Sequence, residues 1–188
     1  MNWPIDIAKL PCLCRSSKIV EHACRPEVVA AARKAARRRS RFSAGVDGQD
    51  RRAFDAAWPV LAREIPDLLR SGEYRWQPFK LVRISPPGGK PRDVYESTRA
   101  DGTASGMLMR AAYDLHVDAA LHDSASAYRR KRGPRQMLEY LFTRATAARP
   151  WFLALDVHRY FPSIDLDAEC NDLLALTEDP AFVMYLWL

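Results

Sequence analysis

The sequence predicts an α+β fold that is rich in helix and contains a β-hairpin and one buried strand. Apolar residues recur at helical spacing over residues 49–69. Residues 79–85 alternate between apolar and charged side chains, and after a Pro-Pro-Gly-Gly turn residues 90–96 can return as a second strand. An apolar run over residues 151–155 ends in Asp156, which is typical of a central strand that delivers an acid at its end.

The first two helices are predicted over residues 26–41 and 49–69. Pro26 in the first turn and many alanines favour the first helix. In the second helix an apolar stripe at intervals of 4, 3, 4 and 3 is expected to face the core. Its members are Phe54, Trp58, Leu61, Ile65 and Leu68. Pro59 and Pro66 indicate a kink or a break within this helix, and Ser71-Gly72 is expected to end it.

Three more helices are predicted over residues 104–121, over residues 134–148 and from about Asp165 onwards. The first is expected to bury one face, formed by Leu108, Ala112, Leu115 and Ala119. Asp165 is expected to cap the helix that follows it, worth about 1 kcal/mol. The apolar segment 181–188 is expected to pack against an element that follows in the chain.

The charge balance favours a polyanionic partner, nucleic acid first. The 188 residues include 29 Lys and Arg against 23 Asp and Glu, a net charge of +6. Basic residues gather in three places: the helix over residues 26–41, the hairpin and the segment 128–133. The hairpin contributes Lys80, Arg83, Lys90 and Arg92. Each group could contact phosphates or could be an ordinary solvated face.

The sequence contains no run of about 18 apolar residues and no signal-peptide pattern at its start, so a cytoplasmic protein with reduced thiols and no membrane contact is expected. Three of the four cysteines lie near a histidine, and together these residues have the side chains of a zinc site. They are Cys12, Cys14, His22 and Cys24. Because Cys12 and Cys14 are only one residue apart, unpaired thiols are the favoured interpretation.

Residues 152–165, Phe-Leu-Ala-Leu-Asp-Val-His-Arg-Tyr-Phe-Pro-Ser-Ile-Asp, resemble the first catalytic motif of reverse transcriptases. In that motif a strand of the palm ends in a metal-binding Asp followed by an aromatic pair. Bacterial group II intron-like and diversity-generating-retroelement enzymes are the most similar. Four upstream segments also resemble this family and occur in its order. They are Gly45-Val-Asp-Gly48, Gly72-Glu-Tyr74 with Pro78, Gly89-Lys90-Pro-Arg92 and residues 126–133.

The resemblance covers about residues 40–175 and implies helix-rich fingers with a β-hairpin over residues 45–150. It also implies the first strand and helix of a polymerase palm over residues 151–188, after an N-terminal basic helical extension over residues 1–44. The implied activity is RNA-directed DNA synthesis, the transfer of deoxynucleotides to a primer 3′-hydroxyl by two Mg²⁺ ions. The implied partners are an RNA template, a DNA primer and deoxynucleoside triphosphates, and an accessory protein is a further candidate.

The resemblance also assigns roles to particular residues. Asp156 and the backbone carbonyl of Val157 would bind metal. Tyr160, with Phe161 beside it, would contact the incoming nucleotide, although a plain core role is the alternative and is the stronger one for Phe161. Lys90 and Arg92 would hold the triphosphate. The basic residues Arg129, Arg130, Lys131 and Arg132 would contact the template backbone.

The sequence departs from the family in several places. The Tyr-x-Asp-Asp motif, the template-grip motif and the thumb do not occur in these 188 residues. Ser85-Pro-Pro follows Ile84 where the family has a lysine, and Tyr128 stands in place of a glycine. The chain alone is therefore expected to be inactive. A non-catalytic RNA-binding module derived from a reverse transcriptase remains an alternative, as does an unrelated basic helical protein.

Overall fold

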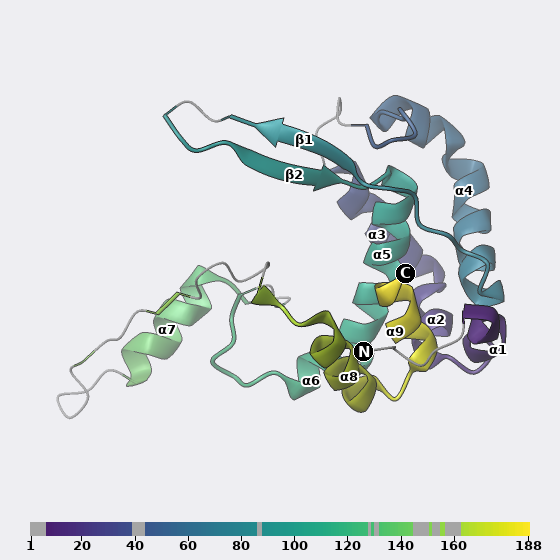
Figure 1. Ribbon diagram of the computed structural model, residues 1–188. Helices are drawn as coiled ribbons and strands as arrows, with labels where there is room; N and C mark the ends of the chain where they lie inside the picture. Colours follow the sequence, from purple (N-terminus) through teal and green to yellow (C-terminus); the bar gives the residue numbers. More distant parts are fainter. Residues whose placement is uncertain are drawn as a thin grey trace.

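The computed structural model describes residues 7–38, 44–85, 88–127, 129, 132–144, 151, 155–156 and 163–188. Over these residues the chain is mainly helical and carries one β-hairpin, which confirms the predicted α+β class (Figure 1). The elements are η1 (Ile7–Lys9), α1 (Leu10–Cys14), α2 (Lys18–Ala23), α3 (Pro26–Arg37), α4 (Arg51–Ser71), β1 (Lys80–Ile84), β2 (Arg92–Glu96), α5 (Arg99–Ala112), η2 (Tyr113–Val117), α6 (Asp118–Ala120), α7 (Pro134–Arg144), α8 (Leu166–Thr177) and α9 (Pro180–Trp187). None of the described helices has the length and apolar character needed to span a membrane.

Helix α5 is the centre of the helical core and packs against α2, α3 and α4 (Figure 1). Small residues let α3 lie close to it, since Ala32 and Ala104 are both fully buried. A Cβ added at Gly106 would lie 3.5 Å from the Ala32 side chain, an ordinary contact distance, so the two backbones are already close. The basic helix α3 is therefore fixed to the core by its alanine face, which leaves its cations on the outside.

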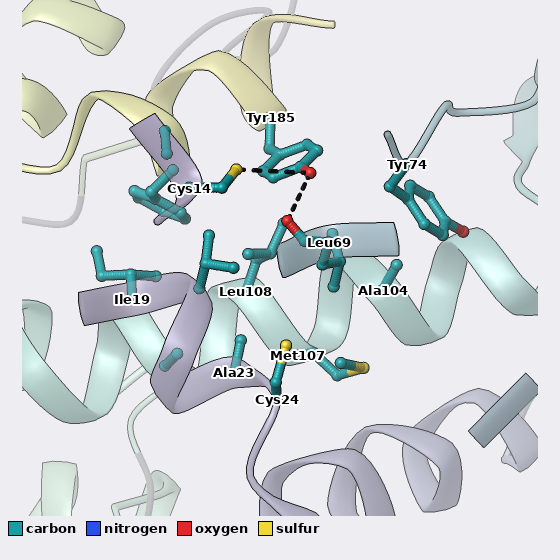
Figure 2. Packing of buried hydrophobic residues seen from close by; sticks show 14 of the residues in the cluster. Cys14, Ile19, Ala23, Cys24, Leu69, Tyr74, Ala104, Met107, Leu108 and Tyr185 are labelled. Carbon is teal, nitrogen blue, oxygen red and sulfur yellow. Dashed lines mark hydrogen bonds between the residues drawn. The ribbon is translucent and has the colours of Figure 1, made fainter. Parts of the chain in front are cut away.

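Helix α9 closes this core from the other end of the chain. Tyr185 is buried, and its hydroxyl donates to the Leu69 carbonyl at 2.9 Å and accepts from the Cys14 thiol at 3.8 Å (Figure 2). The Trp76 indole N–H donates to the Tyr185 carbonyl at 2.9 Å. Helix α9 covers apolar faces of α1 and α2. Its last apolar residues, Leu186, Trp187 and Leu188, remain exposed, and the expectation that this segment packs against a following element stays a prediction.

Asp179 joins the start of α9 to the start of α2. One carboxylate oxygen accepts from the Phe182 N–H at 3.1 Å as the N-cap of α9. The other accepts from the Ser17 hydroxyl at 2.7 Å and the Ile19 N–H at 3.0 Å. Asp179 is only 5% exposed. A buried carboxylate needs several donors to offset its desolvation, and here two helix N-termini supply them.

Two predicted core faces are displaced in the structure. In α4 the helix runs through both prolines without a break, and Leu69 is fully buried whereas Leu68 is 38% exposed. After Ile65 the buried face therefore continues at Leu69, four residues on, rather than at Leu68, three residues on. Both spacings fit a period of 3.6 residues, so the sequence pattern does not distinguish them. Trp58 and Leu61 are partly buried against the core.

In the helix predicted over residues 104–121, Leu108 and Ala112 are buried as expected, but Leu115 is 40% exposed and Ala119 is also exposed. The turn Tyr113–Val117, η2, is a π-helix. A π-turn inserts an extra residue into the helix and rotates the residues that follow it, so their faces no longer continue the stripe. The helix also begins at Arg99, five residues before the predicted start.

The other ends of the helices agree with the sequence to different degrees. Helix α3 ends at Arg37, four residues before the predicted end. The N–H groups of Asp167 and Ala168 donate to the Asp165 side chain, which confirms the predicted cap of α8. Helix α7 ends at Arg144, and the predicted residues 145–148 lie outside the described part of the chain.

We expect Asp179→Ala to destabilise the fold by about 2–4 kcal/mol, because it removes one cap and leaves the Ser17 hydroxyl and the Ile19 N–H buried without an acceptor. The matched control is Asp165→Ala, which removes an exposed helix cap alone and should cost about 1 kcal/mol. Urea denaturation followed by circular dichroism measures both. Equal losses in the two variants would contradict a joining role for Asp179.

Candidate nucleotide and nucleic-acid sites

The hairpin of β1 and β2 confirms the predicted strand pair and projects away from the helical core (Figure 1). Its strands are antiparallel, with Lys80 opposite Glu96 and Ile84 opposite Arg92. Only the opposed pair Val82 and Val94 is half-buried near its middle, and the other large apolar side chains of the strands are exposed. Because an isolated two-stranded hairpin is marginally stable in water, its position depends on how its base is held.

The four cations of the hairpin differ in their partners. Arg83 binds Asp93 on the opposite strand through two hydrogen bonds, at 2.7 and 3.1 Å, and these bonds lower the pKa of Asp93. Lys80 donates to the Ala44 carbonyl at 3.3 Å. Lys90 and Arg92, which flank the tip, are exposed and form no ion pair with any described carboxylate. Of the four, only Arg83 is paired with a described carboxylate, and Lys90 and Arg92 are the two without any side-chain partner among the described residues.

A close backbone contact connects the first glycine motif to the base of the hairpin. A Cβ added at Gly45 would lie 2.7 Å from the Thr98 Cα and 2.9 Å from its nitrogen. Any side chain at this position would push the chain away from the segment that connects β2 to α5. The motif Gly45-Val-Asp-Gly48 therefore has a structural reason for its first glycine.

The second motif, Gly72-Glu-Tyr74, holds the other side of the same base. Gly72 ends α4 in the left-handed region, with φ of 75°, and a Cβ there would lie 2.6 Å from the Pro11 nitrogen. Two residues later Tyr74 is 5% exposed, and its hydroxyl donates to Asp101 at 2.9 Å. Burial and the adjacent Asp101 carboxylate raise the pKa of Tyr74, so it stays a donor.

Asp101 is the residue on which both sides of the hairpin base converge. It is 4% exposed, and its carboxylate accepts from the Tyr74 hydroxyl, from the Thr98 hydroxyl at 2.7 Å and from the Gln77 N–H at 3.2 Å. Tyr74 and Gln77 precede β1, whereas Thr98 follows β2 and caps α5 by accepting from the Asp101 N–H at 3.0 Å. One carboxylate thus fastens both strands to the central helix.

Neither Asp101 nor Thr98 was among the residues predicted from the sequence. The signal was present, because Thr98 and Asp101 are three residues apart at a helix start, the spacing of a reciprocal cap. The predicted helix began only at residue 104 and therefore did not include this cap. Two glycines within residues 99–106 weaken the helical pattern there.

We expect Tyr74→Phe to destabilise the fold by about 1.5–3 kcal/mol, because it removes a buried hydrogen bond to a carboxylate while the ring still fills its place. The control is Tyr113→Phe, which removes an exposed Tyr–Asp hydrogen bond to Asp118 and should leave the denaturation midpoint nearly unchanged. Urea denaturation midpoints compare them. A neutral Tyr74→Phe would mean that Asp101 does not depend on this donor.

Of the predicted buried strand before Asp156, only the two ends are described, so the strand itself stays a prediction. Trp151 is 94% exposed and Leu155 84% exposed, and neither they nor Asp156 belong to a strand. A central strand needs flanking strands to satisfy its backbone groups, and in the described part of the chain the only sheet is the two-stranded hairpin. Residues 152–154 lie outside the described part.

Several predicted site residues cannot be compared with the structure. Val157, Tyr160, Phe161, Arg130 and Lys131 all lie outside the described residues. Asp156 is described and exposed, and it lies between α7 and α8. Within the described part of the chain, no group of three or more potential ligands could hold a metal ion.

Two of the four cations predicted to contact the template are described, and both have protein partners. Arg129 is 9% exposed and donates to the Asp118 carboxylate at 2.9 Å and to the carbonyls of Asp118 and His122. Arg132 binds Asp123 through its carboxylate at 3.0 Å and through its carbonyl. The Arg129 guanidinium therefore fastens the loop after α6 to that helix, and the Arg132 guanidinium joins two parts of the loop itself.

The cysteines considered for zinc point to other partners. The Cys14 thiol contacts the Tyr185 hydroxyl, and the Cys24 thiol donates to the Pro66 carbonyl at 3.5 Å. His22 lies 3.8 Å from Asp114. Burial raises the pKa of Cys14, and it raises the pKa of Cys24 to about 11. Cys12 is exposed.

We expect iodoacetamide at pH 8 to alkylate Cys12 first in the native protein, because it alone of the four thiols is exposed. Cys24 should react far more slowly, since at pH 8 about one thiol in a thousand would be ionised at its raised pKa. Peptide mass mapping against time gives the order, and urea-denatured protein is the control. Fast alkylation of Cys24 in the native protein would contradict its burial.

Comparison with known proteins adds no assignment to these sites: no family model matches the chain, and no curated protein matches it.

Proposed function

We propose that this chain forms the fingers and the beginning of the palm of a reverse transcriptase. The observation that carries the proposal is the convergence of three of its motifs on one hairpin. Gly45 and the Gly72–Tyr74 segment brace the base, and Lys90 and Arg92 stand unpaired at the tip. A rigidly held ribbon with two free cations suits the binding of a nucleoside triphosphate, because charge-assisted hydrogen bonds to phosphate need donors in fixed positions.

In this proposal Asp156 would supply a carboxylate to two Mg²⁺ ions, which activate the primer hydroxyl and stabilise the leaving pyrophosphate. One carboxylate cannot hold two ions alone. The full reaction therefore requires carboxylates that the 188 residues do not supply through a Tyr-x-Asp-Asp motif. Triphosphate binding at the hairpin does not require them and can be measured on this chain.

We expect the double variant Lys90→Gln/Arg92→Gln to weaken binding of a fluorescent deoxynucleoside triphosphate with Mg²⁺ by at least about tenfold, or 1.4 kcal/mol. Fluorescence titration measures the dissociation constant. The matched control, Lys9→Gln/Arg52→Gln, removes the same charge from exposed positions on η1 and α4 and should bind like the unchanged chain. Equal weakening of triphosphate binding in both variants would mean that it depends on net charge alone, and would overturn the proposal.

Primer extension on an RNA template tests the reaction itself, with the 188-residue chain and with any longer product of the same gene. Activity in the longer product that Asp156→Asn abolishes would support the proposal. Normal extension by that variant would overturn the role of Asp156.

A second candidate function is a non-catalytic RNA-binding module. The exposed, non-strand placement of Leu155 and Asp156 favours it, because a metal-binding acid is ordinarily held by rigid structure. RNA binding that needs no Mg²⁺ and falls steeply with salt, without triphosphate binding at the hairpin, would select this function.

A further inference from the structure

A basic groove lies between α3 and α4, on a part of the surface that none of the family motifs accounts for. Both helices make their main contacts with α5 rather than with each other, which leaves a hollow of about 1030 Å³ between them. Cations line both of its walls: Arg33, Lys34, Arg37 and Arg38 from α3, and Arg51, Arg63 and Arg70 from α4. This concentration of positive charge is far above the chain average.

The inner cations are held in place by other side chains. Asp55 of α4 lies 3.2 Å from the Arg33 guanidinium and 3.0 Å from that of Arg37, so one carboxylate fixes two arginines across the groove. Arg33 also lies over the Trp58 ring, with 4.7 Å between its guanidinium carbon and the ring centroid. Among the described carboxylates, Asp55 alone pairs with these two cations, so the pair of arginines keeps a net positive charge.

The far end of α3 is fixed in the same way. Arg51 donates to the Arg37 carbonyl at 2.6 Å, and the buried Arg99 donates to the Ala36 carbonyl at 2.9 Å. These bonds satisfy carbonyls at the C-terminus of the helix, where cations are favoured by the helix dipole. The wall of the groove is therefore rigid before any ligand arrives.

The outer cations are free. Lys34, Arg38 and Arg63 are exposed, and no described carboxylate pairs with them. Lys34 lies on α3 and Arg38 directly follows this helix as its C-cap, one turn away at a rise of about 6 Å. Arg63 faces the same hollow from α4. The groove thus combines preorganised arginines on its floor with unpaired cations along its edges.

We propose that this groove binds the phosphodiester backbone of a single polynucleotide strand, without regard to base sequence. Trp58 is covered by Arg33 on the groove side and contacts Phe54, so it positions the arginine rather than stacking on a base. Arg70 at the far end of the groove is paired with Glu21 and Asp67. The other cations of α4 extend from Arg51 to Arg63, about 18 Å along the helix axis, which is too long for one nucleotide and suits a strand. The site goes beyond the proposed polymerase function and does not depend on it.

The test uses the triple variant Lys34→Gln/Arg38→Gln/Arg63→Gln in the whole chain. Fluorescence anisotropy with a short labelled RNA strand, measured over a range of salt, gives the dissociation constant and its salt dependence. We expect binding to weaken at least tenfold at about 0.1 M salt, and the slope of log K against log salt to fall by about 2, the value for three phosphate contacts on a single strand. A DNA strand of the same length should behave in the same way.

The matched control is Lys9→Gln/Arg15→Gln/Arg52→Gln, which removes the same charge from exposed positions outside the groove. It should retain the affinity and the salt slope of the unchanged chain, and circular dichroism should show all three proteins folded. Equal losses in both triple variants, or no loss in the groove variant, would overturn the proposal.

Two competitors separate the groove from other kinds of site. A nucleoside monophosphate in large excess should fail to displace the labelled strand, and displacement by it would overturn the assignment to a strand. The assignment to a single strand would also be overturned if a duplex bound more tightly than the single strand and lost this higher affinity in the groove variant. Loss of triphosphate binding at the hairpin should leave RNA binding in the groove intact.

Discussion

The Asp101 carboxylate is the interaction on which the arrangement of this molecule depends. It is buried at the start of the central helix and accepts from residues before β1 and after β2. An unpaired carboxylate in this place would cost several kcal/mol, so its donors are held together as a set. The hairpin, which buries little of its own surface, takes its direction from this anchor. The free cations at its tip are thereby presented at a fixed position relative to the helical core.

The positions of the basic residues in the helical core are likewise fixed by buried contacts and by polar partners. Helix α3 buries alanines against α5 and carries its cations on the opposite face, where α4 forms the second wall of the groove. Asp55 is shared by two arginines, and the end of α3 is tied down by Arg51 and Arg99. Among the described residues, unpaired positive charge is therefore concentrated in two places, the groove and the two residues that flank the hairpin tip. By contrast, Arg129 and Arg132, although close together in sequence, act within the fold.

Local patterns in the sequence predicted the elements well where one period or one turn decided the structure. The hairpin, the end of α4 at Gly72 and the cap at Asp165 are of this kind. The predictions from sequence failed or were incomplete where long-range packing determined the structure. A π-turn rotated Leu115 out of the core, and the packing of α9 on the first helices of the chain was not predicted. No sequence period marks either event. Of the candidate site, the residue types were predictable, but the convergence of Gly45, Gly72 and Tyr74 on one hairpin base depends on distances in three dimensions.

The contact of α9 with the N-terminal helices has a consequence for how the chain folds. The Ser17 hydroxyl and the Cys14 thiol meet Asp179 and Tyr185 across 162 and 171 residues of sequence. Contacts of such separation form late, because the chain entropy lost in closing the loop must be offset before they stabilise anything. During synthesis the apolar surface of α1 and α2 that α9 covers therefore remains exposed until nearly all of these residues have left the ribosome. A chaperone that covers this surface in the meantime would raise the yield of folded protein.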